Sequence, residues 1–319
     1  MQDHENLNHH EGQKQHPTLA EASAPTTETR NPRSMDLDML STQDMLSLIN
    51  SEDQKVAIAV ASQIPEITKA VDIIVDRLKQ GGRLFYMGAG TSGRLGILDA
   101  AELKPTFGVG KETVEALIAG GPSAITESVE AAEDSFTAGG NGLKERSISA
   151  KDVVFGIAAS GSTPYVLGGL EVAREAGAAT IGLACNSGSK LREYADVVIE
   201  VVVGPEVLTG STRMKAGTAQ KMVLNMMSTA VMVKLGKVYE NFMVDMQATN
   251  AKLRIRANGM IQATTGVDRD EAQRLLNDAN HDLKTAIVMG KLNVDATTAR
   301  ERLAKSEGYV RRAITDELK

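Results

Sequence analysis

The chain has 319 residues, enough for one large α/β domain or two modest ones around a substantial apolar core. Its 35 basic and 41 acidic residues leave a formal charge of −6, and only 3% of its residues are aromatic, which argues against a basic or aromatic-lined nucleic-acid surface. The single cysteine, Cys185, excludes an internal disulfide and a cysteine-based zinc cluster, and is typical of a reducing compartment. Because four of the five histidines lie in a polar leader, we expect neither a catalytic histidine nor a metal centre.

The start of the chain is polar. Residues 1–26 are rich in His, Gln and Asn and lack apolar periodicity, so we expect a disordered leader, with a metal-binding tract as the alternative. It has no apolar run like that of a secretion signal, and the longest apolar stretch, 222–233, is shorter than a membrane span. We therefore expect a soluble, cytoplasmic protein that binds neither membranes nor nucleic acid.

Helical and strand periodicities then follow in order. Residues 27–73 are assigned to an N-terminal helical segment, in which Ser41 precedes a helix and apolar residues recur at three- and four-residue spacing from Val56 to Leu78. Five short apolar runs predict buried strands: 83–87, 114–118, 153–158, 180–184 and 197–203. Helical patterns separate them: Ser92–Lys104, Ser123–Asp134, Pro164–Ala176 and Lys215–Leu235.

This alternation predicts an α/β fold, a doubly wound parallel sheet flanked by helices, over residues 74–237. Such sheets bind ligands beyond the carboxyl ends of their strands. After Asn250 no strand pattern remains, and the segments 268–279, 281–289, 296–304 and 308–318 read as short helices. We therefore assign residues 238–319 to a C-terminal helical region that forms a small bundle.

Three predicted strand exits combine glycine with hydroxyl side chains directly before a helix. Glycine lets the backbone approach an anion, and a helix N-terminus offers unpaired N–H groups and a partial positive charge. Ordinary helix capping by Ser and Thr is the alternative for any one loop. The candidate binding residues are Gly90, Thr91 and Ser92 in the first loop, Ser160, Ser162 and Thr163 in the second, and Ser211 and Lys215 in the third.

The first loop also matches the dinucleotide fingerprint G-x-G-x-x-G. However, the second predicted strand ends in Ala119-Gly120-Gly121, without the carboxylate that would bind a ribose, and the chain has no Walker sequence. A compact phosphomonoester such as a sugar phosphate is therefore a better fit than NAD or ATP.

Two segments carry candidate catalytic carboxylates, and the first is the helix after the first loop. Asp99 and Glu102 share a helix face with Leu95 and Leu98, where a core helix would be apolar. A closed site would desolvate such a carboxylate and raise its pKa toward neutrality, as general acid–base catalysis needs; a solvated helix end or an ion pair is the alternative.

Glu133 is the second candidate. It lies at the edge of the apolar stripe of the predicted helix Ser123–Asp134 and in its last turn, where the helix dipole disfavours an anion. Both effects would raise its pKa, whereas Glu127 and Asp134 point away from the stripe. An ordinary surface glutamate is the alternative reading.

Longer motifs carry a resemblance to a known family. The run Met87–Gly108 closely resembles the signature of N-acetylmuramic acid 6-phosphate etherases, which have the sugar-isomerase (SIS) phosphosugar-binding fold. Further matches cover Thr26–Thr42, Leu117–Ser135, Gly156–Glu171, Val207–Thr229 and Met243–Leu253. The resemblance extends from about Thr26 to the C-terminus. Leu103-Lys104 departs from the Cys-Pro or similar pair that is common in the family.

The resemblance implies cleavage of the D-lactyl ether of N-acetylmuramic acid 6-phosphate, which yields N-acetylglucosamine 6-phosphate and D-lactate by elimination and then hydration. By motif position, Glu133 would remove the C2 proton, and Glu102 would protonate the departing lactate and later activate water. The open-chain C1 aldehyde activates the C2 proton, so no cofactor is implied. The only partners implied are the phosphosugar substrate and, as a homodimer, a second copy of the chain.

An unbroken helix would separate Ser92 from Glu102 by about 15 Å along its axis. That exceeds the span of one sugar phosphate, so we expect Glu102 to meet a substrate held by another loop or by a second subunit. Two rival functions remain open. One is an aldose–ketose phosphosugar isomerase, which would release no lactate; the other is a non-catalytic sugar-phosphate sensor, which would need neither acid.

Overall fold

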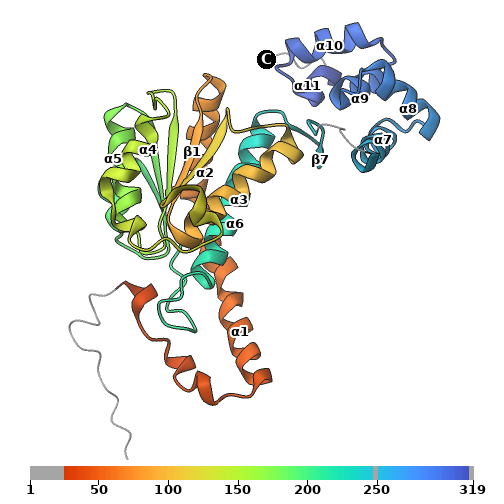
Figure 1. Ribbon diagram of the computed structural model, residues 1–319. Helices are drawn as coiled ribbons and strands as arrows, with labels where there is room; N and C mark the ends of the chain where they lie inside the picture. The colour runs from red at the N-terminus through yellow and green to blue at the C-terminus, as the bar shows by residue number, and fades with distance from the viewer. Residues whose placement is uncertain (1–24, 247–250, 316–319) are drawn as a thin grey trace, which may run out of the picture.

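A five-stranded parallel sheet forms the centre of the molecule (Figure 1). The computed structural model describes residues 25–246 and 251–315. The strand order is β2-β1-β3-β4-β5, which confirms the five predicted strands and their parallel pairing. The strands are β1 (Leu84–Gly88), β2 (Val114–Ile118), β3 (Val153–Ile157), β4 (Ala179–Ala184) and β5 (Val197–Glu200). Gly88 at the end of β1 pairs with Ile118 of β2 and with Ile157 of β3, so these three strands end at the same edge.

Helices cover both faces of the sheet, as the doubly wound prediction requires. They are α1 (Thr42–Ala61), α2 (Ile64–Lys79), α3 (Gly90–Phe107), α4 (Phe136–Lys144), α5 (Pro164–Glu175) and α6 (Lys215–Lys234). Helices α2, α3 and α6 pack on the face that carries Tyr86 and Phe155, and α4 and α5 pack on the face that carries Phe85 and Val154 (Figure 1). Helix α1 packs on α6, and its Val56 and Val60 join the core on the first of these faces. All four of these strand side chains are fully buried, which explains why the strands read as continuous apolar runs.

The N-terminal segment makes contacts from Thr26 onward. Residues 1–24 of the leader lie outside the described residues, but Thr26 begins a short 3-10 turn, and its hydroxyl donates to Asn186 Oδ1 at 2.8 Å. The described part of the chain therefore begins at about the expected end of the leader. Ser41 caps α1 by accepting from the backbone of Asp44, as predicted. The helical pattern of 56–78 is split between α1 and α2, because Pro65 lies in the first turn of α2.

The connection between β2 and β3 differs from the prediction. The expected helix Ser123–Asp134 is wrong: two 3-10 turns, Gly121–Ile125 and Ala132–Asp134, are joined by a loop instead. Ala131, inside the expected helix, has a positive φ of 58°, which a continuous right-handed helix does not accommodate, and Gly120 and Gly121 just before it have φ angles of 86° and 71°.

The unpredicted helix α4 follows these turns. Its sequence is glycine-rich because it packs closely on α5: a Cβ at Gly139 would lie 1.9 Å from the carbonyl oxygen of Tyr165. Intrinsic propensity disfavours glycine in a helix, so the packing decides the structure here.

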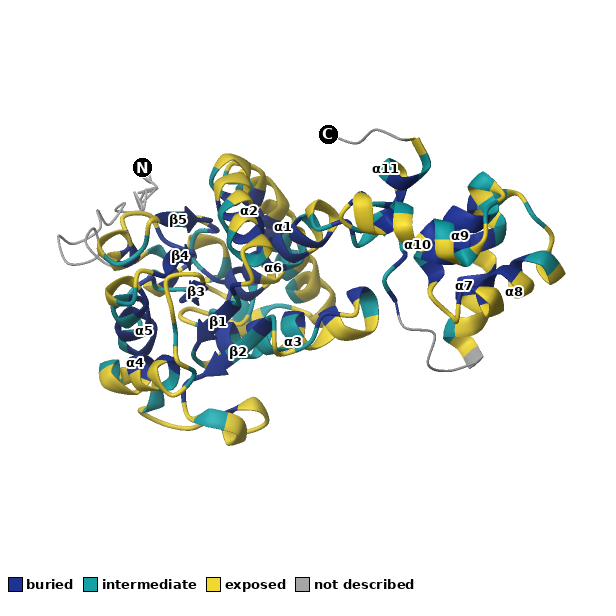
Figure 2. Ribbon diagram, turned by 90° about the horizontal axis from the view of Figure 1, so that it is seen from above, coloured by how far each residue is buried: buried dark blue, intermediate teal, exposed yellow. Residues whose placement is uncertain are grey.

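The C-terminal helices form a bundle with its own apolar core, set apart from the sheet (Figures 1 and 2). A two-stranded hairpin, β6 (Val238–Tyr239) and β7 (Phe242–Met243), precedes it. The helices are α7 (Ala251–Thr265), α8 (Arg269–Asp278), α9 (Leu283–Leu292), α10 (Ala296–Lys305) and α11 (Val310–Thr315). The hairpin and α7 were not predicted, and the end of the last predicted helix lies outside the described residues. The division into domains at residues 26, 73 and 237 stays a prediction.

Candidate active site

The first two predicted loops lie side by side where the winding of the sheet reverses. From β1 the chain crosses through α3 to β2, and from β3 it crosses through α5 to β4 in the opposite direction. Because β1 and β3 are neighbours, the loops that follow them flank the switch point, the usual ligand crevice of such sheets. Figure 2 shows these strands between helices of the two layers.

At the end of β1, the N-terminus of α3 carries no side-chain cap. Its N-cap residue is Ala89, and Gly90 adopts a positive φ of 50°. Thr91 is half-buried, and Ser92 is buried with its hydroxyl 3.0 Å from Gln220 Oε1. The first N–H groups of α3 are therefore available to an anion.

At the end of β3, the hydroxyls do not act as ordinary caps either. Thr163 is the N-cap residue of α5, but its side chain makes no capping bond. Ser162 donates from both its backbone N–H and its hydroxyl to Ser160 Oγ, each at 3.2 Å. Gly161 has a φ of 73°, and a Cβ there would lie 2.3 Å from Ser189 Cβ, so only glycine fits.

The exits of β4 and β5 are filled by the protein's own carboxylates. In the loop after β4, the backbone N–H groups of Ser189 and Gly188 donate to Glu200, the last residue of β5, at 2.8 Å and 3.2 Å. Glu200 also pairs with Arg192. Burial alone would raise the pKa of Glu200, but these donors outweigh it and lower the pKa to about 2. After β5, Glu206 accepts from the first two N–H groups of α6, and burial raises its pKa.

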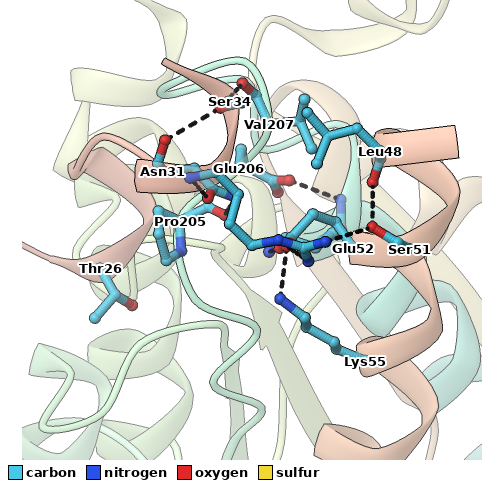
Figure 3. A network of polar contacts seen from close by, with 12 residues as sticks. Thr26, Asn31, Ser34, Leu48, Ser51, Glu52, Lys55, Pro205, Glu206 and Val207 are labelled. Atoms are coloured by element: carbon cyan, nitrogen blue, oxygen red, sulfur yellow. Dashed lines mark hydrogen bonds and ion pairs between the residues drawn. The ribbon is translucent and has the colours of Figure 1, made fainter. Parts of the chain in front are cut away.

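Lys215, in the third loop, is used within the protein. It is 2% exposed, and its Nζ lies 2.7 Å from Oε2 of Glu52 on α1, whose side chain is also 2% exposed. Glu52 also pairs with Arg33 and Lys55 (Figure 3). Burial would raise the pKa of Glu52, but Lys215 and Lys55 lower it to about 2. The structure thus places the ammonium of Lys215 against Glu52, while Ser211 is half-buried.

A cavity of about 330 Å³ opens beside the first loop. Gly90 and Arg94 form one wall, and the segment that replaces the predicted helix forms the other, with Glu133 among its lining residues. Arg94 donates to the backbone carbonyls of Ile125 and Glu127 and so holds this segment in place. Glu133 is exposed to the cavity and lies in a short 3-10 turn, so the expected helix-dipole effect at a last turn does not apply.

Glu102 lies near the other end of α3. The helix is unbroken from Gly90 to Phe107, so Glu102 is about 18 Å along its axis from Gly90. Its side chain is exposed, and Leu98, one turn earlier, is 50% exposed. The expectation that burial keeps Glu102 and Glu133 out of water is therefore wrong for the single chain.

The buried acid of this helix is Asp99 instead. It is 4% exposed and accepts from the hydroxyls of Tyr86 and Ser228 and from the amide of Asn225. Burial raises the pKa of Asp99. Asp99 and Glu102 are separated by about 60° around the helix axis. That rotation is enough for Asp99 to face the core while Glu102 faces solvent. These contacts fix α3 against β1 and α6.

Sequence reasoning did not identify Gln220, Glu52, Glu200 or Glu206. The sequence offers one signal for Gln220. It lies three residues after Gly217, whose lack of a side chain lets the first turn of α6 approach Thr91. Within residues 25–246 and 251–315, no cluster of three or more His, Cys, Asp or Glu side chains could hold a metal ion. In the same residues, none of the helices is long and apolar enough to cross a bilayer.

The matching family models agree with the fold. Residues 66–174 match the glucokinase regulatory protein N-terminal SIS domain, and residues 140–230 match the SIS domain. Phosphoheptose isomerases from Neisseria gonorrhoeae and Francisella tularensis align with 60% of this chain and 98% of their own, at TM-scores of 0.45 and 0.42 and identities of 16% and 20%.

Curated relatives are much closer in sequence. The N-acetylmuramic acid 6-phosphate etherase of Cronobacter sakazakii is 54% identical over 90% of this chain and 97% of its own. That of Salmonella agona is 53% identical over the same shares, and that of Caldanaerobacter subterraneus is 54% identical over 90% of this chain and 94% of its own.

Proposed function

The chain belongs to the N-acetylmuramic acid 6-phosphate etherase family, and on that premise we propose how its residues carry out the reaction. It cleaves the D-lactyl ether of N-acetylmuramic acid 6-phosphate and releases N-acetylglucosamine 6-phosphate and D-lactate. The names of the relatives do not favour the isomerase or sensor alternatives. We place the enzyme in the cytoplasm, in cell-wall sugar recycling or catabolism, because a free cysteine and a phosphorylated substrate are typical of that compartment.

The phosphate binds at the exits of β1 and β3. The supporting observation is that α3 and α5 both begin there without a side-chain cap, so two helix N-termini and the hydroxyls of Thr91, Ser160 and Thr163 remain for an anion. Ser92 and Ser162, whose hydroxyls bond to Gln220 and Ser160 in this structure, turn to the phosphate when it binds. Gly90 allows the phosphate to approach the backbone. In the third loop, the hydroxyl of Ser211 contributes to substrate binding, whereas Lys215 acts by holding α6 against α1 through Glu52.

Glu133 removes the C2 proton of the open-chain sugar. It lines the cavity beside the first loop, within reach of a sugar whose phosphate sits at the N-terminus of α3. The electron pair of the C2–H bond forms an enolate with the C1 aldehyde and then a C2–C3 double bond as the C3–O bond breaks. Lactate leaves with a proton from Glu102. Glu102 then takes a proton from water as the water's hydroxyl adds to C3, and Glu133 returns its proton to C2, so both carboxyl groups regain their starting protonation states.

Glu102 reaches the reacting carbons from a second copy of the chain, in a homodimer. Two observations support this arrangement: the distance along α3 from Gly90, and the exposed Leu98 beside Glu102, which a partner would cover. The partner would also exclude water from both carboxylates and close the site around the sugar.

The position of Glu133 in the cavity beside an uncapped helix N-terminus carries this mechanism. Purified protein incubated with N-acetylmuramic acid 6-phosphate is expected to release one D-lactate per substrate, whereas the Glu133→Gln variant releases none. Retained lactate release by Glu133→Gln would contradict the assigned base.

Mixing the two inactive variants tests the shared site. When Glu102→Gln and Glu133→Gln chains are mixed, random heterodimers contain one intact site each if sites are shared, and about a quarter of wild-type activity returns. If each chain carries a complete site, no activity returns, and the cross-subunit arrangement is wrong.

A further inference from the structure

A buried amide beside the first loop is only half used. Gln220 on α6 is 1% exposed, and its Oε1 accepts the hydroxyl of Ser92 at 3.0 Å. Its Nε2, which can donate two hydrogen bonds, is buried without a hydrogen-bond partner among the described residues. Buried donors are rarely left unpaired, so this atom calls for a functional explanation.

The amide lies directly behind the proposed phosphate position. Ser92 belongs to the first turn of α3, whose N–H groups have no side-chain cap. The first turn of α6 packs closely on the same turn, since a Cβ at Gly217 would lie 3.3 Å from Thr91 Cγ2. Gln220 is therefore connected to the proposed anion site by one hydrogen-bonded group, the hydroxyl of Ser92.

The side-chain amide of glutamine can rotate by 180° about its last side-chain bond, so that its oxygen and nitrogen exchange positions. In the structure, the hydroxyl hydrogen of Ser92 is directed at Gln220 Oε1. After a turn of the amide, Nε2 would donate to Ser92 Oγ, and the hydroxyl hydrogen would be free to donate to a phosphate oxygen. The atom left unpaired would then be an acceptor, which proteins tolerate better than an unpaired donor.

We propose that Gln220 is a positioning residue, whose amide orients the hydroxyl of Ser92 as a donor to the substrate's phosphate. The inference rests on the proposed placement of the phosphate at the exit of β1. It adds a residue on α6, remote in sequence from the loops, to the determinants of substrate affinity. Gln220 itself touches neither the phosphate nor the reacting carbons.

Two substitutions separate positioning from packing. Gln220→Met keeps the volume and removes the amide, and we expect KM to rise about fivefold with little change in kcat. Gln220→Glu can only accept while it is ionised, and it adds a negative charge next to the phosphate, so KM should rise about twentyfold at pH 8.

The pH dependence gives the specific signature. A buried glutamate has a raised pKa, and once protonated its O–H can donate to Ser92 Oγ as Nε2 does. The ratio of KM for Gln220→Glu to that of the wild type should therefore fall as the pH is lowered from 8 to 6. Taking the ratio at each pH removes the titration of the phosphate itself.

Ser228→Ala is the matched control, because Ser228 is a buried polar residue of the same helix that bonds to Asp99. It is expected to lower the melting temperature and leave KM unchanged. The double variant Ser92→Ala/Gln220→Met should raise KM no more than Ser92→Ala alone, since the two residues act as one unit.

The inference is wrong if both Gln220 variants lower the melting temperature but keep the wild-type KM, or if the double variant shows additive effects. If the Gln220 variants do not fold, the rise in melting temperature that inorganic phosphate causes is measured instead. Ser92→Ala must lose most of the rise seen with the wild type, and full retention of it overturns the inference. If the wild type releases no lactate while phosphate still stabilises it through Ser92 and Gln220, the proposed function fails and the positioning role stands.

Discussion

The exits of β1 and β3 and the exits of β4 and β5 look alike in sequence but differ in structure. All carry glycine or hydroxyl residues after a buried strand. At β4 and β5, Glu200 and Glu206 accept hydrogen bonds from the free N–H groups, whereas among the described residues no side chain caps the helices that follow β1 and β3. The same local geometry thus serves as an internal anchor at one side of the sheet and remains open for a ligand at its switch point.

The difference implies a division between stability and affinity. Substitutions at the filled exits should lower the free energy of unfolding and leave substrate affinity unchanged. Substitutions at the open exits should do the reverse. The following predictions test this division.

The largest effect is expected where Lys215 is buried after β5. Glu52→Gln leaves the ammonium of Lys215 without its charge partner, and the free energy of unfolding should fall by about 3–5 kcal/mol, measured by urea unfolding. Glu66→Gln is the matched control, because Glu66 pairs with Lys69 in an exposed i, i+3 pair, and such a pair contributes only about 0–1 kcal/mol. Equal losses in the two variants would contradict the anchoring role of Lys215.

The filled exit of β4 should show a smaller loss with a defined pH dependence. Glu200→Gln keeps the shape but not the charge, so we expect a loss of about 1–3 kcal/mol at pH 7. The pKa of Glu200 is lowered from 4.5 to about 2, so its contribution is complete above about pH 4.5 and is lost as the pH falls toward 2. Unfolding experiments at pH 7, 4 and 3 should show the difference between the two proteins shrinking; a constant difference would contradict this.

At the open exit of β3, Ser160→Ala should raise KM about tenfold, equivalent to about 1.4 kcal/mol, because the phosphate loses its organised hydroxyl pair. The melting temperature should hardly change. Steady-state kinetics and thermal unfolding check both halves of the prediction, and an unaltered KM would remove this loop from the site.

Ser189→Ala should have the smallest effect and serves as the counterpart of Ser160→Ala. The Oγ of Ser189 is buried near Glu200 and makes no hydrogen bond of normal geometry among the described residues, so its removal should change the free energy of unfolding by less than about 0.5 kcal/mol. KM should stay at the wild-type value. A KM increase comparable to that of Ser160→Ala would erase the distinction between open and filled exits.

Much of the fold could be predicted because its strands are buried on both faces and therefore read as continuous apolar runs. The segment from Gly120 to Lys144 could not. Its apolar spacing resembles a helix, but the positive φ angle at Ala131 interrupts it. Helix α4 forms where propensity disfavours it, because Gly139 allows close contact with α5.

The site was predictable to the level of loops but not of individual contacts. Glycine, hydroxyls and a following helix mark every strand exit alike, and only the packing reveals that Glu206 fills one of them or that Lys215 turns to Glu52. Similarly, the spacing that joins Asp99 and Glu102 on one face does not show which of them faces the core. That choice depends on Tyr86 and α6, which lie far from them in the chain.

Exchange of the C2 proton in heavy water tests the central claim most directly, that Glu133 acts as the base on a sugar held at the open exits. Substrate recovered after incubation with Glu102→Gln should carry deuterium at C2 although no lactate is released, whereas substrate recovered from Glu133→Gln should carry none. Deuterium incorporation at an undiminished rate with Glu133→Gln would contradict the account.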